Sequence, residues 1–147
     1  MQSPCKNKLK LTLPSLSVNE GAARAIVSAF CAQLNPTASE LADIKCAVSE
    51  AVTNCIVHAY PDAVGEIYIA VKLFDGRKIK IEIKDKGRGI EDINLARTPL
   101  YTTDKSGERS GMGFSVMESF MDKVTLASAV GRYTRVVLTK TLSPLEV

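Results

Sequence analysis

Two neighbouring segments with strictly alternating apolar and polar residues constrain the fold more than any other feature. They cover residues 66–74 and 78–84, and such alternation is typical of half-buried β-strands. The short connection between them contains Asp75-Gly76, which is a strong hairpin signal. The inward side of this hairpin is entirely aliphatic: Ile67, Ile69, Val71, Leu73, Ile79, Ile81 and Ile83. An isolated hairpin is marginally stable, so this side must pack against other elements.

Two segments with helical spacing precede the hairpin and can cover it. Each starts at a Ser or Thr with a Glu three residues later, the pattern of a capping box: Ser17 with Glu20, and Thr37 with Glu40. The first has apolar residues at 22, 23, 26, 27, 30 and 34 and stops at Asn35-Pro36, and the second ends near Tyr60-Pro61. We therefore predict two amphipathic helices between residues 17 and 60.

The remaining segments add strands and one more helix. Residues 8–13 alternate up to Pro14 and predict a half-buried strand near a sheet edge. Residues 114–121 have helical spacing, and residues 124–128 and 133–140 predict a closing strand pair turned at Gly131. Regular patterns are lacking from about residue 91 to residue 113, which indicates a functional loop, or lid, with a short helix near residues 92–96.

This order of elements predicts one domain over residues 1–147. The expected fold is α+β, a two-layer α/β sandwich with one mixed, mostly antiparallel sheet and helices on one face. The length of 147 residues and the apolar content of 46% give such a domain its own core.

Charge and cysteine content exclude several kinds of protein. Nineteen Lys and Arg against 16 Asp and Glu give a net charge of +3, and the basic residues are scattered singly along the sequence. This charge is too small and too dispersed to argue for nucleic acid or an anionic membrane as a partner. No CxxC motif is present, and Cys31, Cys46 and Cys55 occupy apolar positions of the helices, so we expect buried free thiols in a reducing cytoplasm. No stretch has the length and apolarity of a signal core or a membrane span.

The second predicted helix carries an unusual polar stripe. Glu50 and Asn54 are four residues apart, so their side chains are neighbours on the helix surface, opposite the apolar face. A carboxylate beside an amide can activate a hydroxyl group or hold a hard cation such as Mg²⁺. The same pair can also be an ordinary solvated helix face.

Two glycine motifs follow. Asp85-x-Gly87-x-Gly89 comes directly after a strand, where glycines let the backbone turn tightly and approach a planar ligand. Gly111-Met112-Gly113 precedes the helix at 114–121, and glycines there expose backbone N–H groups at the positive end of the helix dipole, where phosphate oxygens bind. Either motif alone could be a plain turn.

Taken in this order, the three motifs resemble those of the GHKL superfamily of ATP-binding domains, which includes gyrase, Hsp90, sensor histidine kinases and MutL. The N box of that superfamily corresponds to Glu50-x-x-x-Asn54, its first glycine box to Asp85-x-Gly87-x-Gly89, and its second to Gly107 through Gly113. Within it, residues 49–54, 99–103 and 109–114 are most similar to the small anti-sigma serine kinases, in particular those of sporulation.

The resemblance implies a role for each matching residue. Asn54 would bind the Mg²⁺ that bridges the ATP phosphates, and Glu50 would act as general base on a substrate serine. Asp85 would accept a hydrogen bond from adenine, with Gly87 and Gly89 lining the base pocket. Other expected nucleotide contacts lie in the lid and in the second glycine box: Thr102, Thr103, Gly111, Met112 and Gly113. Arg109 is the candidate contact to the γ-phosphate, and the alternative is a solvated loop arginine.

We therefore expect a cytoplasmic, ATP-dependent serine kinase that also acts as an anti-sigma factor. It would hold a sporulation sigma factor in one state and phosphorylate an anti-anti-sigma protein in another. The resemblance implies a homodimer paired through the first strand and first helix, where Arg24 is a candidate partner contact. Three alternatives stay open: a general-stress anti-sigma kinase, a binding module that traps its partner with ATP and transfers no phosphate, and a metabolic ATPase.

Overall fold

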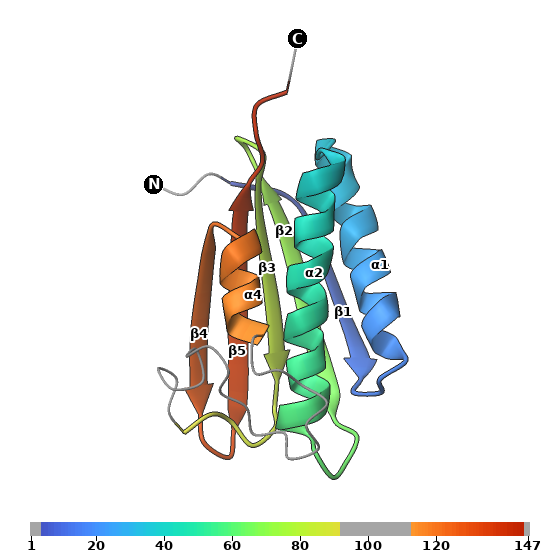
Figure 1. The fold of residues 1–147 in the computed structure, drawn as a ribbon, viewed down its shortest axis with the longest axis vertical. Coiled ribbons are helices and arrows are strands. Elements are labelled where there is room, and N and C mark those ends of the chain that lie inside the picture. Colours follow the sequence, from blue (N-terminus) through green and yellow to red (C-terminus); the bar gives the residue numbers. More distant parts are fainter. Residues whose placement is uncertain (1–3, 92–112, 146–147) are drawn as a thin grey trace.

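The described part of the chain forms one sheet with its helices on a single face (Figure 1). The computed structural model describes residues 4–91 and 113–145. The elements follow in the order β1 (Cys5–Pro14), α1 (Asn19–Cys31), the 3₁₀ turn η1 (Ala32–Leu34), α2 (Ala38–Asn54), the π turn η2 (Cys55–Ala59), β2 (Glu66–Phe74), β3 (Lys78–Asp85), α4 (Gly113–Phe120), β4 (Lys123–Ala129) and β5 (Tyr133–Thr141). The short helix expected near residues 92–96 and most of the lid lie outside the described residues.

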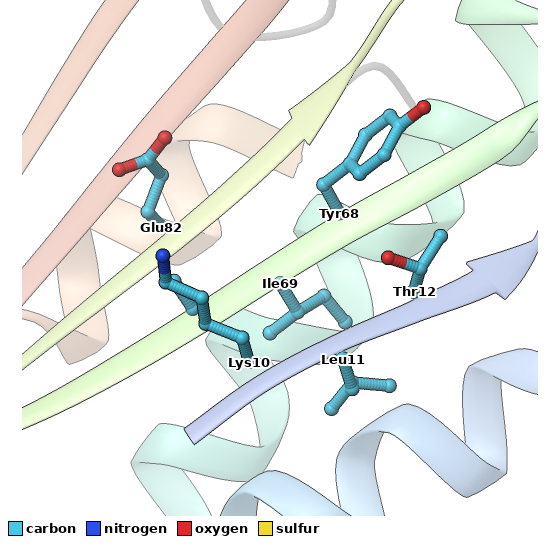
Figure 2. A pocket seen from close by; sticks show the side chains of 7 residues that line it. Lys10, Leu11, Thr12, Tyr68, Ile69 and Glu82 are labelled. Atoms are coloured by element: carbon cyan, nitrogen blue, oxygen red, sulfur yellow. The ribbon is translucent and has the colours of Figure 1, made fainter. Parts of the chain in front are cut away.

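The five strands lie in the order β1-β2-β3-β5-β4. The predicted α+β sandwich is thus confirmed, and β1 is an edge strand as expected. One detail was wrong: the sheet is not mixed, because all four pairings among the described strands are antiparallel. Figure 2 shows Lys10, Thr12 and Tyr68 on the side of the sheet that no described helix covers.

The core lies between the helices and the inward side of β2 and β3. The aliphatic side chains that alternation predicted to face inward are at most 2% exposed: Ile67, Ile69, Val71, Leu73, Ile79, Ile81 and Ile83. Each contributes about 1.5–3 kcal/mol by leaving water. Helix α2 covers them with Ile44, Val48 and Val52, which are 0% exposed.

Helix α1 departs from the sequence prediction at its start. The capping box of Ser17 and Glu20 is absent, because the helix begins at Asn19 and no side chain caps it. The chain leaving β1 is instead tied locally, with the Asn19 side chain donating to the Pro14 carbonyl at 2.9 Å. Ile26, expected on the apolar face, is 41% exposed.

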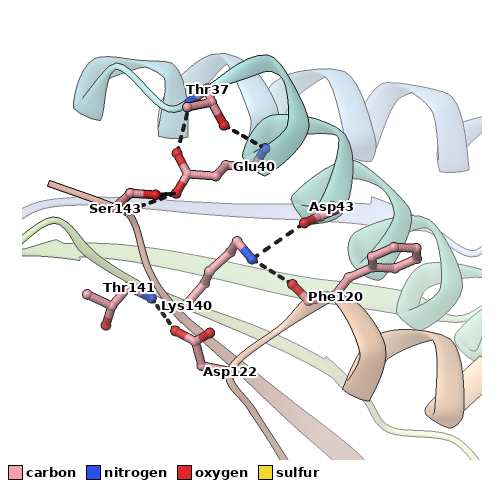
Figure 3. A network of polar contacts seen from close by, with 8 residues as sticks. All are labelled: Thr37, Glu40, Asp43, Phe120, Asp122, Lys140, Thr141 and Ser143. Carbon is pink, nitrogen blue, oxygen red and sulfur yellow. Dashed lines mark hydrogen bonds and ion pairs between the residues drawn. The ribbon is translucent and has the colours of Figure 1, made fainter. Parts of the chain in front are cut away.

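Helix α2 starts as predicted. The Glu40 N–H donates to the Thr37 hydroxyl at 3.0 Å, and the Thr37 N–H donates to the Glu40 carboxylate at 2.9 Å. The second carboxylate oxygen of Glu40 accepts from the Ser143 N–H at 2.8 Å (Figure 3). Backbone hydrogen bonds from Thr37 and Ser143 lower the pKa of Glu40 to about 2. The capping box thereby also holds the segment that follows β5.

A second polar contact fixes the helix layer to the sheet at this end. The Lys140 ammonium of β5 donates to the Phe120 carbonyl at the end of α4, at 2.8 Å, and lies 3.7 Å from the Asp43 carboxylate of α2. The side chain of Lys140 is only 12% exposed, so water screens this ion pair less than it screens a surface pair. One amine thus joins two helices and a strand (Figure 3).

The two Ser/Thr-x-x-Glu sequences give a matched test. We expect Thr37→Ala to lower the free energy of unfolding by about 1 kcal/mol, because an N-cap hydroxyl is lost. Ser17→Ala should change it by less than about 0.5 kcal/mol, because Ser17 caps nothing. Urea denaturation of both variants measures the difference. Equal losses would contradict the two helix starts described here.

Candidate functional site

Three segments that are distant in sequence meet at one end of the sheet. They are the end of α2 with η2, the loop that follows β3, and the start of α4 (Figure 1). The far end of the helix layer, with the Glu40 and Lys140 contacts, lies at the opposite end of α2.

Glu50, Asn54 and Gly113 come together at the start of α4. A Cβ atom added at Gly113 would lie 3.2 Å from the Asn54 amide nitrogen and 3.4 Å from Glu50 Oε2. Both side chains are half-buried. A side chain at this position would fit tightly, and the Asn54 amide would have to shift by a few tenths of an ångström to admit it. Glu50 and Asn54 of α2 and the last glycine of the second glycine motif are thus neighbours in the structure.

The α-helical geometry of α2 stops at Asn54, and a π turn continues it. The sequence predicted an ordinary helix up to Tyr60, so η2 was not foreseen. Its last carbonyl, that of Ala59, accepts a hydrogen bond from the Arg88 N–H at 3.2 Å. A Cβ at Gly87 would overlap this same carbonyl group. The π turn therefore seats the loop after β3 directly on the end of the helix, a use of π turns that is frequent at functional sites.

Tyr60 holds the same loop from the side. Its hydroxyl accepts from the Lys86 N–H at 2.7 Å and donates to the Glu66 carbonyl at 2.8 Å. This role had no signal in the sequence, because Tyr60 stands next to Pro61 and marked only the end of a helix.

The other side of the loop is tied to the turn between β4 and β5. The Gly131 N–H donates to the Arg88 carbonyl at 2.6 Å, and the Ile90 N–H donates to the Ser128 hydroxyl at 2.8 Å. Gly89 has a φ of +75°, and a Cβ there would overlap the Ala129 carbonyl. A side chain at this position is excluded both by backbone strain and by space. The loop is consequently fixed on both sides.

Asp85 carries a buried carboxyl group at the end of β3. It is 3% exposed, and one of its oxygens accepts from the Gly87 N–H at 3.0 Å. Burial raises the pKa of Asp85, while hydrogen bonds from Gly87, Cys55 and Thr134 oppose that increase. A buried acidic group with a perturbed pKa beside a glycine loop is typical of a ligand-binding site.

The cysteine predictions were partly correct. Cys31 and Cys55 are buried free thiols as expected, and burial raises the pKa of Cys31 to about 12. Burial, followed by the nearby charge of Asp85, raises the pKa of Cys55 well above its ordinary value. Cys46 was wrongly placed in the core, since it lies on the exposed side of α2.

Five predicted site residues lie outside the described residues: Thr102, Thr103, Arg109, Gly111 and Met112. Over residues 4–91 and 113–145, no group of three or more His, Cys, Asp or Glu side chains is arranged to hold a metal ion. Within the same residues, every helix is too short or too polar to cross a membrane.

Comparisons with known proteins agree with this geometry. The family model of the histidine kinase-like ATPase domain matches residues 13–140. An anti-sigma F factor of Thermoanaerobacter sp. (strain X514) is 53% identical over 135 residues, which cover 91% of this chain and 93% of the relative. An anti-sigma F factor of Bacillus velezensis (strain DSM 23117) is 50% identical over 139 residues, which cover 94% of each chain.

Solved structures show the same fold at low sequence identity. The crystal structure of the RsbU and RsbW domains of a Mycobacterium tuberculosis protein aligns with a TM-score of 0.68 and 22% identity, over 93% of this chain and 32% of that one. The histidine kinase domain of a blue-light activated histidine kinase from Erythrobacter litoralis aligns with a TM-score of 0.56 and 18% identity, over 84% of this chain and 61% of that one.

Burial of Asp85 makes a prediction about stability. Because its pKa is raised in the folded protein, the folded state binds the proton more tightly than the unfolded state does. Stability should therefore fall as pH rises from the ordinary value of 3.8 through the raised pKa. We expect Asp85→Asn, whose side-chain oxygen can still accept a hydrogen bond from the Gly87 N–H, to raise the free energy of unfolding at pH 7. At pH values below 3.8 the variant should be as stable as wild type. Denaturation at a series of pH values tests this, and a less stable variant at pH 7 would contradict it.

Proposed function

Because this chain belongs to the anti-sigma F factors, within the histidine kinase-like ATPase domains, we propose that it inhibits a sporulation sigma factor and phosphorylates a serine of an anti-anti-sigma protein. ATP is the phosphoryl donor, and the sigma factor is of the sigma F type. We place this activity in the cytoplasm. The observation that carries the proposal is the meeting of Glu50, Asn54 and Gly113 beside the loop that Asp85 begins.

Asp85 supports recognition of adenine. An ionised carboxylate only accepts hydrogen bonds, so the base that pairs with it must present a donor. The exocyclic amino group of adenine is such a donor, whereas guanine presents a carbonyl oxygen at the equivalent position. A buried carboxylate facing a carbonyl would lose a hydrogen bond and repel it, which disfavours GTP. The loop with Gly87 and Gly89, fixed on both sides, gives the base a flat and preformed wall.

Asn54 and the start of α4 support phosphate binding. The first backbone N–H groups of α4 have no partner within the helix, and they lie at the positive end of its dipole. Mg²⁺, when bound with ATP, neutralises phosphate charge, and the side-chain oxygen of Asn54 is the ligand that this chain offers it. A site of this kind needs few protein ligands, because phosphate oxygens and water supply the others. Arg109, Thr102, Thr103, Gly111 and Met112 complete the phosphate site in this proposal.

Glu50 has the position and chemistry of a general base. Its carboxylate lies one helical turn before Asn54 and faces the start of α4. It accepts the proton of the substrate serine as the serine oxygen bonds to the γ-phosphorus and the bond to the β–γ bridging oxygen breaks, leaving ADP. Phosphoryl transfer depends mainly on positioning and charge neutralisation, which the rigid end of α2 provides.

Partner binding is proposed for β1 and α1. Strand β1 has one edge without a neighbour among the described strands, and a second copy of the chain can pair there to form the homodimer. Arg24 of α1 has a side chain 47% exposed and lies 3.4 Å from Glu20, so it can exchange that weak surface ion pair for a partner carboxylate.

Substitution of Glu50 separates kinase activity from nucleotide binding. We expect Glu50→Gln to lower transfer of labelled phosphate to the anti-anti-sigma protein about 100-fold or more, with ATP affinity retained, because only the base is lost. Asn54→Ala should lose both. Lys45→Ala, exposed on the same helix, is the control and should change neither.

The same experiment tests two of the alternatives, the binding module and the metabolic ATPase. ATP binding without label transfer by the wild-type protein would leave a nucleotide-gated binding module. Rapid ATP hydrolysis without any protein substrate would indicate a metabolic ATPase. Wild-type transfer rates in Glu50→Gln would remove Glu50 from the role of base.

A further inference from the structure

The face of the sheet turned away from the helices is rich in lysine. Every second residue of the strands projects there, and no described helix covers it (Figure 1). Its basic residues come from all five strands: Lys8, Lys10, Lys72, Lys78, Lys80, Lys84, Lys123 and Arg135. Two acidic residues, Glu66 and Glu82, share this face. The face therefore carries a strong positive charge that the net charge of the chain does not reveal.

Three of these lysines stand in a single row across the sheet. The strand register places Lys8 of β1 opposite Lys72 of β2, and Lys72 opposite Lys80 of β3. Adjacent strands are about 4.8 Å apart, so the three side chains start from neighbouring positions. Like charges directly opposite one another destabilise a sheet. We call Lys8, Lys72 and Lys80 the lysine row.

The described residues do not neutralise the lysine row. The ion pairs on or near this face join Lys6 to Asp75 and Arg135 to Glu82. Among residues 4–91 and 113–145, no carboxylate lies within ion-pair distance of the three row lysines. Unrelieved repulsion in the middle of a sheet is unfavourable for folding alone, and it is relieved when an anion binds.

A shallow pocket of about 220 Å³ adjoins the row. Its lining includes Ala70, the small residue next to Lys72 on this face. Lys10, Thr12, Tyr68 and Glu82 also line it (Figure 2). A pocket of this volume accepts one apolar side chain. An apolar side chain that entered it would leave water and anchor the contact.

We propose that this face is a docking surface for an acidic, extended segment of a partner protein. Glutamate or aspartate side chains of the segment pair with the lysine row, and one apolar side chain enters the pocket over Ala70. Charge complementarity sets the orientation, and the pocket adds a preference for sequence.

The aromatic residues of this face favour a protein over a nucleic acid. Single-stranded nucleic acids are held by stacking their bases on aromatic rings. Here the Tyr68 ring is covered by the Lys86 ammonium at 5.0 Å, and the Tyr133 ring by that of Lys84 at 5.5 Å. Arginine is the residue that binds phosphate in bidentate fashion. Among the described residues of this face, the arginine is Arg135, and it forms an ion pair with Glu82 at 3.0 Å.

The docking surface is separate from the nucleotide site. Lys80 and Asp85 are both in β3, five residues apart, which is about 17 Å along an extended strand. They also project to opposite faces, because their separation is odd. An acidic segment can therefore bind with ATP present, so failure of the kinase proposal would leave this one standing.

The test uses a short labelled peptide with glutamate at every second position, serine between them and one central leucine. We expect Lys72→Gln/Lys80→Gln to weaken peptide binding about tenfold, with ATP affinity unchanged. The control Lys45→Gln/Arg132→Gln removes the same charge from exposed positions in α2 and in the turn between β4 and β5, and it should weaken binding less than twofold. The row variant should also melt at a higher temperature than wild type, because repulsion is removed.

A second variant tests the pocket. Ala70→Leu should reduce binding of the leucine peptide. It should leave unchanged the binding of a peptide in which serine replaces the central leucine and the glutamates are kept. Equal weakening by the two double variants, or no peptide binding by the wild-type protein, would overturn the proposal. Tighter binding of a short oligonucleotide than of the peptide, lost in the row variant, would also overturn it and indicate a nucleic acid surface.

Discussion

The buried carboxyl group of Asp85 is the constraint on which the rest of the site depends. A carboxylate that is 3% exposed is unfavourable unless hydrogen bonds replace its water, and here the Gly87 N–H supplies one. That bond requires the loop after β3 to fold back on the strand end. The fold-back in turn brings Gly87 against the carbonyl of Ala59, the last residue of the π turn at the end of α2. The burial of this one carboxyl group thus positions the end of β3, the loop after it and the end of α2. The same burial raises the pKa of Asp85.

Helix α2 is stabilised at one end and specialised at the other. At its start, the capping box satisfies two backbone N–H groups and Glu40 holds the segment after β5. At its end, regular α-helical bonding gives way to the π turn, and Glu50 and Asn54 face Gly113. An uncommon backbone conformation such as a π turn persists where the surrounding structure holds it in place. The well-satisfied start and the buried apolar face of α2 hold the helix in place, so its last turns can be shaped by the site.

The sequence predicted the features that depend on local pattern and missed those that depend on packing. The hairpin of β2 and β3 and the start of α2 were correct, because alternation and capping act over a few residues. Ser17 and Glu20 form the same pattern as Thr37 and Glu40, yet the turn that leaves β1 delays the helix to Asn19. The exposure of Ile26 and Cys46, and the π turn, follow from how the helices meet their neighbours, which no spacing encodes. The lysine row could not be predicted from the sequence either, because Lys8, Lys72 and Lys80 are far apart along the chain. The register of the strands brings them together.

Strand β3 joins the two surfaces that this structure presents to other molecules. Its odd-numbered residues form the core and end at Asp85, and its even-numbered residues carry Lys78, Lys80 and Lys84 on the opposite face. A central strand paired on both sides, with Ile79, Ile81 and Ile83 at most 1% exposed, has no second arrangement available to it. Coupling between sites requires an element with two states that both sites bias. Since β3 is held in one arrangement by its pairing and burial, we expect an acidic segment on the lysine row and a nucleotide at Asp85 to bind independently.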